Sequence, residues 1–435
     1  MIKVKLRSFF LFNNKHYKIM KKLLILFSII FIFLPNTFSQ QNSNSKNLEV
    51  GADRLISNYM NLIEGKRIGL VTNASGILSN GTPLVDTLFK MKGIKITALF
   101  GPEHGIRGNA PAGKAVGSSV DAKTGIPVYS LFGKIKKPTA EMLKNVDVLI
   151  YDIQDVGARF YTYISTLFYV VQAGAENNIP VIVLDRPNPI NGLNVEGPIR
   201  KDDEASFVGI APIPIMHGMT VGELAKLYSG EGYIGKNLKP DLTVIKMKNW
   251  NRKFYLDHYN LPWIDPSPNI PNLETAIVYP GLCLIEGTNV SEGRGTYHPF
   301  INIGAPYINS DSLINKLKDY NVKGVELSPV KYTPVDIPKM SANPKYKGEM
   351  CSGITIHVVD RNQFKAVHFG IKLVCALHSL YPKKFKFRDS GFDRLSGDKS
   401  IREKILAGET PEKIISSWQN ELKNFLTIRK KYLLY

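Results

Sequence analysis

Short apolar runs alternate with amphipathic segments over the first half of the chain. Runs that are apolar almost throughout are typical of parallel strands covered on both faces, whereas a 3.6-residue period indicates helices. This pattern predicts strands at 67–73, 94–100, 127–131, 146–152 and 181–185. It predicts helices between them at 83–91, 139–143 and 161–176. The β-α-β order indicates an α/β fold with a Rossmann-like, doubly wound and mostly parallel sheet.

The second half of the chain has a looser pattern. Proline and glycine are dense over 187–214, and five prolines lie within 261–280. We interpret the second segment as the boundary between an N-terminal domain over 51–270 and a smaller α/β domain over 271–435. Further elements are expected as strands at 243–247 and 353–359, a helix behind a capping box at 221–229, and helices at 311–317, 364–380 and 410–432.

The N-terminal segment has the composition of an export signal. Basic residues precede an apolar run at 23–34, and small or polar residues follow at 36–39. That run is shorter than the roughly 20 residues that span a bilayer. We therefore expect a signal peptide over 1–39, a flexible lead-in over 40–50, and an exported chain, periplasmic or secreted, with no stable membrane span. An uncleaved anchor is the competing interpretation.

The formal net charge of +19 falls to +12 without residues 1–39, which hold seven basic residues and no acid. Such a surface suits a polyanion. For an exported protein we expect a carboxylate-rich wall polymer rather than nucleic acid, although a solvated lysine-rich surface explains the charge equally well. The three cysteines argue against a full disulfide framework, and leave one disulfide or buried thiols.

Polar residues follow the predicted strands of the N-terminal half. The carboxyl ends of parallel strands meet at one edge of a sheet, where open α/β sheets bind ligands. We therefore expect these polar loops to share one crevice. They begin at Asn73, in the segment 100–108, at Asp152-Ile153-Gln154-Asp155 and at Asp185-Arg186-Pro187-Asn188.

The segment 100–108, FGPEHGIRG, carries the leading candidate for catalysis. Glu103 and His104 lie there among glycines and a proline, which restrict the backbone. Glycoside hydrolysis usually needs one carboxylic acid to protonate the leaving oxygen and a second carboxylate as nucleophile or base. Glu103 is the expected acid/base. The candidates for the second carboxylate are Asp152, Asp155, Asp185, Glu286 and Glu292. Asp152 and Asp185 end strands, so a structural role is the alternative for these two.

A second polar cluster lies at 284–296 and contains Glu286, Asn289, Glu292 and Arg294. We expect it to close over the crevice from the C-terminal domain, with a glycine-rich interdomain turn as the alternative. Arg294 is a suitable bidentate partner for a substrate carboxylate. Tyr161 and Trp263 are suited to stacking on sugar rings or to packing in the core.

Other chemistries lack their motifs. The first strand is not followed by G-x-G-x-x-G, and the chain has no P-loop, no H-E-x-x-H and no G-x-S-x-G. Glu103 and His104 are adjacent, so extended backbone would point them to opposite sides. His217 and His298 are isolated in the sequence. We expect no catalytic metal and no cofactor.

At these residues the chain resembles the exo-β-N-acetylmuramidases of the NamZ type, long known as a family of unknown function. The matching motifs occur in one order over about residues 50–435, so together they are far more specific than any one of them. They are GLVTN (69–73), FGPEHG (100–105), DIQDVGARFY (152–161), DRPNP (185–189), EGTN (286–289) and SEGRG (291–295).

The resemblance implies an exported glycosidase that removes N-acetylmuramic acid from the non-reducing ends of peptidoglycan fragments such as MurNAc-GlcNAc. It implies an active site between a Rossmann-like domain and a second α/β domain, with the family's catalytic glutamate at Glu103. A muramic acid pocket needs a cation, and a basic residue also rejects uncharged N-acetylglucosamine. Arg294 or Arg159 is expected to supply that cation.

The side chains expected to contact substrate are Asn73, His104, Asp155, Arg159, Tyr161, Arg186, Asn188, Glu286, Asn289, Glu292 and Arg294. Two other hypotheses remain at this point. A muropeptide-binding protein would bind wall fragments without cleaving them. A basic structural protein would explain the charge but not the polar loops.

Overall fold

The computed structural model describes residues 47–108 and 119–435. The expected signal peptide over 1–39 and most of the lead-in over 40–50 lie outside these ranges. Among the residues that are described, no helix is both long enough and apolar enough to cross a membrane.

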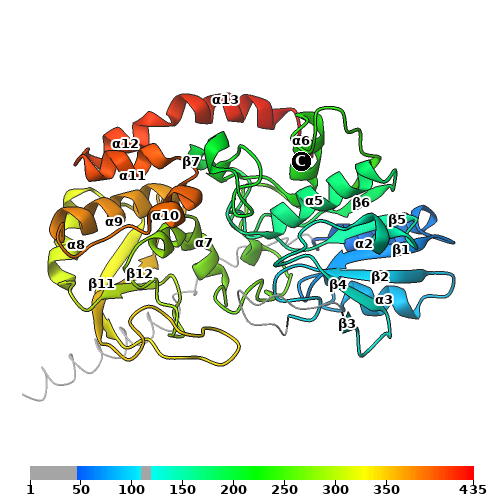
Figure 1. The fold of residues 1–435 in the computed structure, drawn as a ribbon, viewed down its shortest axis with the longest axis horizontal. Helices are drawn as coiled ribbons and strands as arrows, with labels where there is room; N and C mark the ends of the chain where they lie inside the picture. The colour runs from blue at the N-terminus through cyan, green and yellow to red at the C-terminus, as the bar shows by residue number, and fades with distance from the viewer. Residues whose placement is uncertain (1–46, 109–118) are drawn as a thin grey trace, which may run out of the picture. The chain divides into compact units, whose positions relative to one another are not determined.

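A seven-stranded sheet forms the N-terminal half, in blue to green in Figure 1. The strand order is β3-β4-β2-β1-β5-β6-β9, and every neighbouring pair is parallel except β3 with β4. The expected mostly parallel α/β sheet is therefore confirmed. Its strands are β1 (Arg67–Thr72), β2 (Lys95–Gly101), β3 (Ser119–Val120), β4 (Pro127–Ser130), β5 (Val148–Asp152), β6 (Val181–Leu184) and β9 (Leu242–Ile245).

Helices cover both faces of this sheet. Leu70 and Ile150 pack with α2 and α3, whereas Tyr151 and Val183 pack with α5 and α6 on the opposite face. Successive residues of a strand point to opposite faces, so covering both faces requires strands that are apolar almost throughout. The helices are α2 (Gly51–Asn58), α3 (Leu84–Lys90), α4 (Ala140–Leu143), α5 (Tyr163–Glu176) and α6 (Val221–Gly230).

Local capping fixes where two of these helices begin. The hydroxyl of Thr139 accepts the N–H of Met142 at the start of α4. Thr220 and Glu223 form a reciprocal capping box at the start of α6. Side-chain caps satisfy N–H groups that the first turn of a helix leaves without partners.

A second sheet of three antiparallel strands forms the C-terminal half, in the order β10-β12-β11. Helix α7 begins inside the proline-rich segment that the sequence pattern indicates as a boundary, and it packs closely on α9. A Cβ on Gly281 would lie 1.9 Å from the carbonyl oxygen of Ala366, so only glycine allows this approach. The elements are α7 (Leu273–Leu282), β10 (Asn302–Ala305), α8 (Ser310–Asp319), β11 (Val325–Tyr332), β12 (Cys351–Val358), α9 (Ala366–Leu380), α10 (Asp389–Ser396) and α11 (Lys399–Leu406).

One expectation about the C-terminal region is wrong. The pattern over 410–432 predicts one helix, but the structure has α12 (Pro411–Ser417) and α13 (Gln419–Lys430), separated at Trp418. The indole of Trp418 is buried, and its backbone leaves the helical region at φ −101° and ψ 0°. Burial of this large side chain therefore turns the chain between two helices that share one amphipathic pattern.

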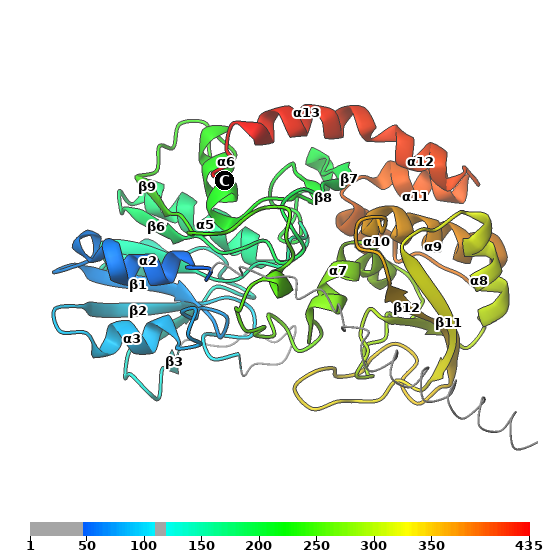
Figure 2. The same ribbon diagram turned by 180° about the vertical axis from the view of Figure 1, so that it is seen from behind.

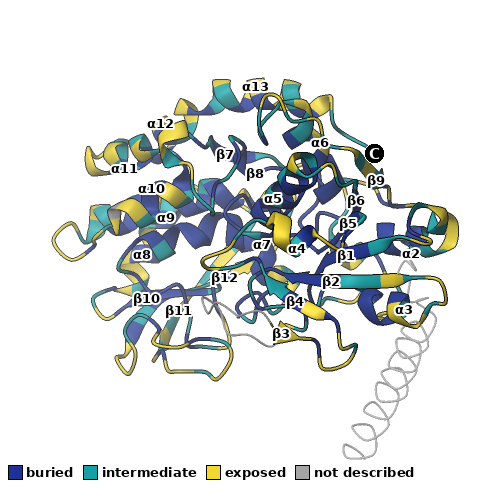
Figure 3. Ribbon diagram, turned by 45° about the vertical axis from the view of Figure 1, so that its right-hand side comes forward, coloured by how far each residue is buried: buried dark blue, intermediate teal, exposed yellow. Residues whose placement is uncertain are grey.

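The C-terminal segment returns to the first sheet. Helix α13 runs across from the second sheet towards α6, as Figure 2 shows. Arg429 donates to the carbonyl oxygen of Gly218 at 2.6 Å, and the hydroxyl of Tyr435 donates to Asp185 at 2.7 Å. Between the two sheets, a hairpin of β7 (Glu196–Ile199) and β8 (Pro214–Met216) contacts both α9 and α13. Figure 3 shows the central strands and α7 largely buried, with exposed positions on the outer helices and on the surface loops.

Candidate active site

The strand order reverses direction between β1 and β5, which are neighbours at the centre of the sheet. From there the chain builds β2 and β4 on one side and β6 and β9 on the other, which creates the crevice where such sheets bind ligands. The loops after β1 and β5 meet at this point. Asn73 accepts two hydrogen bonds from Ser75, and the hydroxyl of Ser75 accepts the N–H of Gln154 at 3.0 Å.

A hollow lies at this reversal point. Its floor comes from the loops after β1, β5 and β6, and its wall comes from the segment 256–266. The lining residues include Ser75, Gln154, Arg186, Leu261, Trp263 and Pro266. Trp263 donates its indole N–H to the carbonyl oxygen of Ile270 at 3.3 Å, so the ring is fixed beside the hollow.

Glu103 lies in the loop after β2 and is half-buried. Next to it, His104 is buried and adopts a positive φ of 71°, a conformation that is unusual for a residue with a side chain. Burial is the main cause that raises the pKa of the Tyr161 and Tyr163 hydroxyls, and the charge of Glu103 raises both further. Glu103 is therefore within electrostatic reach of the two tyrosines that follow the β5 loop.

Aromatic side chains connect this loop to the C-terminal half. The hydroxyl of Tyr163 donates to the carbonyl oxygen of Pro266 at 2.5 Å. The ring centre of Tyr161 lies 4.8 Å from that of Tyr163 and 6.0 Å from that of Tyr279 in α7. Tyr279 in turn contacts Phe300 edge-on at 4.9 Å. Tyr161 is buried in this stack, so its aromatic face is used inside the protein.

The second predicted cluster lies beyond this stack and forms an ion-pair network. Arg294 donates through Nε and Nη2 to Oε1 of Glu286, and its Nε lies 3.5 Å from Glu292. Burial alone would lower the pKa of Arg294, but the charges of Glu286 and Glu292 outweigh it and raise that pKa. Lys345 lies 2.9 Å from Glu292 and donates to carbonyl oxygens of this loop. Glu286 and Arg294 each keep about 28% of their side chain exposed, so this part of the network faces solvent.

Two of the predicted carboxylates are deeply buried. Asp152 accepts hydrogen bonds from Nε and Nη2 of Arg186 at 2.6 and 2.9 Å. Burial raises the pKa of Asp152, although the charge of this arginine lowers it. Asp185 accepts from Gly222, Thr220 and Tyr435, and burial raises the pKa of Asp185 to about 7. Both groups organise the carboxyl ends of their strands, and their catalytic assignment stays a prediction.

Three other predicted residues are held by backbone groups. Arg159 is 1% exposed and donates to four carbonyl oxygens, and burial lowers its pKa to about 9. Asn188 donates to the carbonyl oxygen of Met219, and Asn289 donates to that of Lys384. The geometry leaves Arg294 better placed than Arg159 to meet a substrate carboxylate.

The sequence pattern misses one residue that belongs to this region. His217 follows β8, is fully buried, and has Nε2 3.3 Å from Oδ2 of Asp155. It is isolated in the sequence, 62 positions from its partner, and the short hairpin that carries it has no strong strand pattern. Spacing along the chain gives no signal for such a pair.

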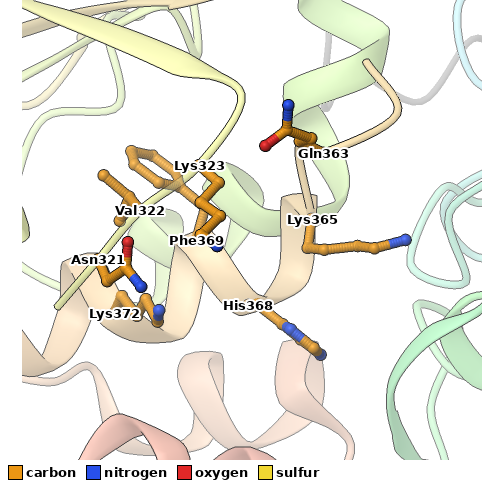
Figure 4. A pocket seen from close by; sticks show the side chains of 8 residues that line it. All are labelled: Asn321, Val322, Lys323, Gln363, Lys365, His368, Phe369 and Lys372. Atoms are coloured by element: carbon orange, nitrogen blue, oxygen red, sulfur yellow. The ribbon is translucent and has the colours of Figure 1, made fainter. Parts of the chain in front are cut away.

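A separate cavity of about 170 Å³ lies in the C-terminal half, where Lys323, Lys365, Lys372 and His368 line it (Figure 4). None of the predicted site residues lines it. The three cysteines have free, buried thiols. Within residues 47–108 and 119–435, no group of three or more His, Cys, Asp or Glu side chains is arranged to hold a metal ion.

Comparison with known proteins adds independent findings. The family model described as exo-beta-N-acetylmuramidase NamZ, N-terminal, matches residues 68–274, and the corresponding C-terminal model matches residues 277–435. Peptidoglycan beta-N-acetylmuramidase NamZ of Bacillus subtilis (strain 168) is 49% identical over 396 residues, which cover 91% of this chain and 93% of that protein.

Two crystal structures of DUF1343 family proteins from Bacteroides fragilis NCTC 9343 are also similar. The first has a TM-score of 0.82 at 36% identity, and the second has a TM-score of 0.73 at 34% identity. Each match covers 89% of this chain and 99% of the other. The whole described fold is thus shared with solved structures.

Proposed function

We propose that this chain, which belongs to the exo-beta-N-acetylmuramidase NamZ family, hydrolyses the glycosidic bond of terminal N-acetylmuramic acid in peptidoglycan fragments. The observation that carries this proposal is the extensive identity to a B. subtilis protein named as a peptidoglycan beta-N-acetylmuramidase. That match runs through both halves of the chain. A protein that only binds muropeptides is not favoured, because the similar protein is named as an enzyme.

Glu103 is the acid/base of the proposed reaction. It stands at the carboxyl edge of the sheet, near two tyrosines whose pKa is raised by burial and further by the charge of Glu103. In this role the carboxylic acid gives its proton to the oxygen of the leaving sugar as the bond to the anomeric carbon breaks. The oxocarbenium-like transition state carries positive charge, which nearby carboxylates stabilise.

Arg294 is the proposed cation for the lactyl carboxylate of muramic acid. Its partially exposed guanidinium is held by Glu286 and lies 5.3 Å from the ring of Phe300, so its direction is fixed before substrate binds. A planar guanidinium recognises a carboxylate by two parallel hydrogen bonds. Such a contact favours muramic acid over uncharged N-acetylglucosamine.

The proposed site of action is outside the cytoplasm. The basic residues and the apolar run at 23–34 support export, although they lie outside the described residues. Peptidoglycan fragments are accessible to an exported chain. N-terminal sequencing of the protein recovered from an expressing cell tests this point, since export by signal cleavage predicts a mature terminus near residue 40.

The activity is tested with three substrates and the purified mature chain. A MurNAc-GlcNAc disaccharide and a chromogenic β-N-acetylmuraminide are expected to release N-acetylmuramic acid, whereas the matching β-N-acetylglucosaminide is expected to stay intact. Release from the glucosaminide at an equal rate would contradict the proposed specificity. Absence of release from all three would contradict the proposed activity.

A further inference from the structure

One buried carboxylate oxygen in the candidate site has no hydrogen-bond donor. Asp155 lies in the loop after β5 and is 4% exposed. Its Oδ2 accepts the N–H of Gly157 at 2.8 Å, but its Oδ1 is buried and has no hydrogen-bond partner in the part of the chain that the structure describes. Leaving a buried acceptor without a donor is energetically unfavourable. A ligand that donates to Oδ1 would remove that cost.

His217 lies beside the other oxygen of the same carboxylate. The ring is fully buried, and its Nδ1 accepts the N–H of Met219 at 3.2 Å. An acceptor nitrogen carries no proton, so the neutral ring has its proton on Nε2. Nε2 lies 3.3 Å from Oδ2 of Asp155. Nε2 makes no hydrogen bond within the described residues, so the imidazole limits how Asp155 turns by packing beside the carboxylate.

Asp155 and Glu103 influence the same tyrosine. Burial is the main cause that raises the pKa of Tyr163, and the charges of Glu103 and Asp155 both contribute. Burial raises the pKa of the Tyr151 and Tyr228 hydroxyls, and the charge of Asp155 raises both further, so Asp155 lies among buried aromatic side chains. In such surroundings a charge acts more strongly on its neighbours than it does in water.

The other candidates for the second carboxylate are each paired with a cation or with hydrogen-bond donors. Both oxygens of Asp152 accept hydrogen bonds from Arg186, and both oxygens of Asp185 accept hydrogen bonds from Thr220 and Gly222. Glu286 and Glu292 are occupied by cations of the second cluster. Asp155 combines an open oxygen with electrostatic proximity to the tyrosine that Glu103 also affects.

We propose that Asp155 is the second carboxylate of the hydrolysis proposed above, with Oδ1 towards the reacting sugar, and that His217 is the residue that positions it. The inference rests on that proposed function. The anionic Oδ1 stabilises the positive charge that develops at the anomeric carbon while Glu103 protonates the leaving oxygen. The carboxylate acts here as a fixed charge, which accepts the N–H of Gly157 and lies beside His217 before substrate arrives.

The test measures kcat and KM on the chromogenic β-N-acetylmuraminide for four variants. Asp155→Asn keeps the shape of the side chain and is expected to lower kcat at least about 100-fold with KM nearly unchanged. His217→Phe is expected to lower kcat less. His217→Gln, which can present an N–H at a similar place, is expected to recover part of that loss. The double variant of Asp155→Asn and His217→Phe is expected to be no slower than Asp155→Asn alone, because the histidine acts through the aspartate.

The matched control is His378→Gln, a half-buried histidine near the end of α9 whose ring centre lies 6.2 Å from that of Phe385. It is expected to keep wild-type kcat. Wild-type kcat in Asp155→Asn, or losses that add in the double variant, would overturn the inference while the activity itself stands. Should Asp155→Asn not fold, equal kcat in His217→Phe and His217→Gln overturns it. An inactive wild-type enzyme would instead contradict the proposed function.

Discussion

Gly397 packs its α-carbon directly against the guanidinium of Arg159. Its φ is +76°, and a Cβ at this position would lie 2.5 Å from Nη2 of Arg159. The same guanidinium donates to the carbonyl oxygens of Pro198 and Ser396, at 2.9 and 2.7 Å. Arg159 therefore joins the hairpin between the sheets to the end of α10. Arg159 therefore has a structural role in the fold, although the sequence motif that contains it is also compatible with substrate binding.

Arg159→Met is expected to lower the free energy of unfolding by about 3–5 kcal/mol, because it leaves buried carbonyl oxygens without donors. Urea unfolding followed by circular dichroism measures this. Arg54→Met, which removes a more exposed arginine, is the control and is expected to cost less than about 1 kcal/mol. If Arg159 instead held the substrate carboxylate, the variant would unfold like wild type and show a raised KM.

The apolar pattern predicts most of the fold because parallel strands covered on both faces leave few alternatives. All five strands predicted in the first half form with ends shifted by no more than two residues. The pattern fails where tertiary packing decides. Trp418 divides one amphipathic stretch into α12 and α13, and α7 forms in a proline-rich segment because Gly281 allows close contact with α9.

The site is predictable to the extent that sheet topology brings loop residues together. The loops that carry Asn73 and Gln154 do meet, because β1 and β5 are neighbours. Topology cannot tell which polar side chains stay free for a ligand. Arg159 and Asp185 belong to the right loops, yet their hydrogen bonds go to groups far away in the sequence, such as Ser396 and Tyr435. His217 pairs with a residue that no spacing rule connects to it.

Glu103→Gln is expected to lower kcat about 100- to 10,000-fold on the β-N-acetylmuraminide, because the amide cannot donate the proton that the leaving oxygen needs. KM and the thermal unfolding temperature are expected to change little, since Glu103 is only half-buried. The control is Glu141→Gln, on the exposed surface of α4. A folded Glu103→Gln protein with wild-type turnover would contradict the acid/base assignment.

Arg294→Lys is expected to raise KM for the muraminide about 10-fold, and Arg294→Ala somewhat more, because each loses the bidentate contact with a carboxylate. The Lys variant keeps a positive charge beside Glu286 and Glu292, so it separates the loss of geometry from the loss of charge. Arg361→Ala, which removes an arginine paired with Asp257, is the control. A second substrate, a muraminide whose lactyl carboxylate is reduced to the alcohol, tests the role of Arg294. If the Arg294 variants raise KM equally for this substrate, Arg294 does not bind the lactyl carboxylate.

Glu196→Gln is expected to change how stability depends on pH. Burial is the main cause that raises the pKa of Glu196 to about 7, and its Oε2 accepts the N–H of Val367 at the start of α9. An unfolded glutamate titrates near about 4.3, so the folded protein binds the extra proton between about pH 4 and 7. The stability that this group contributes is therefore present at low pH and is lost as pH rises through that window.

Glutamine does not titrate, so the variant is expected to gain about 1–3 kcal/mol relative to wild type between pH 5 and pH 8. Urea unfolding at both pH values measures the difference, and Glu64→Gln on the exposed surface is expected to show no such change. A constant difference between Glu196→Gln and wild type at the two pH values would mean that Glu196 is ionised in the fold throughout the range.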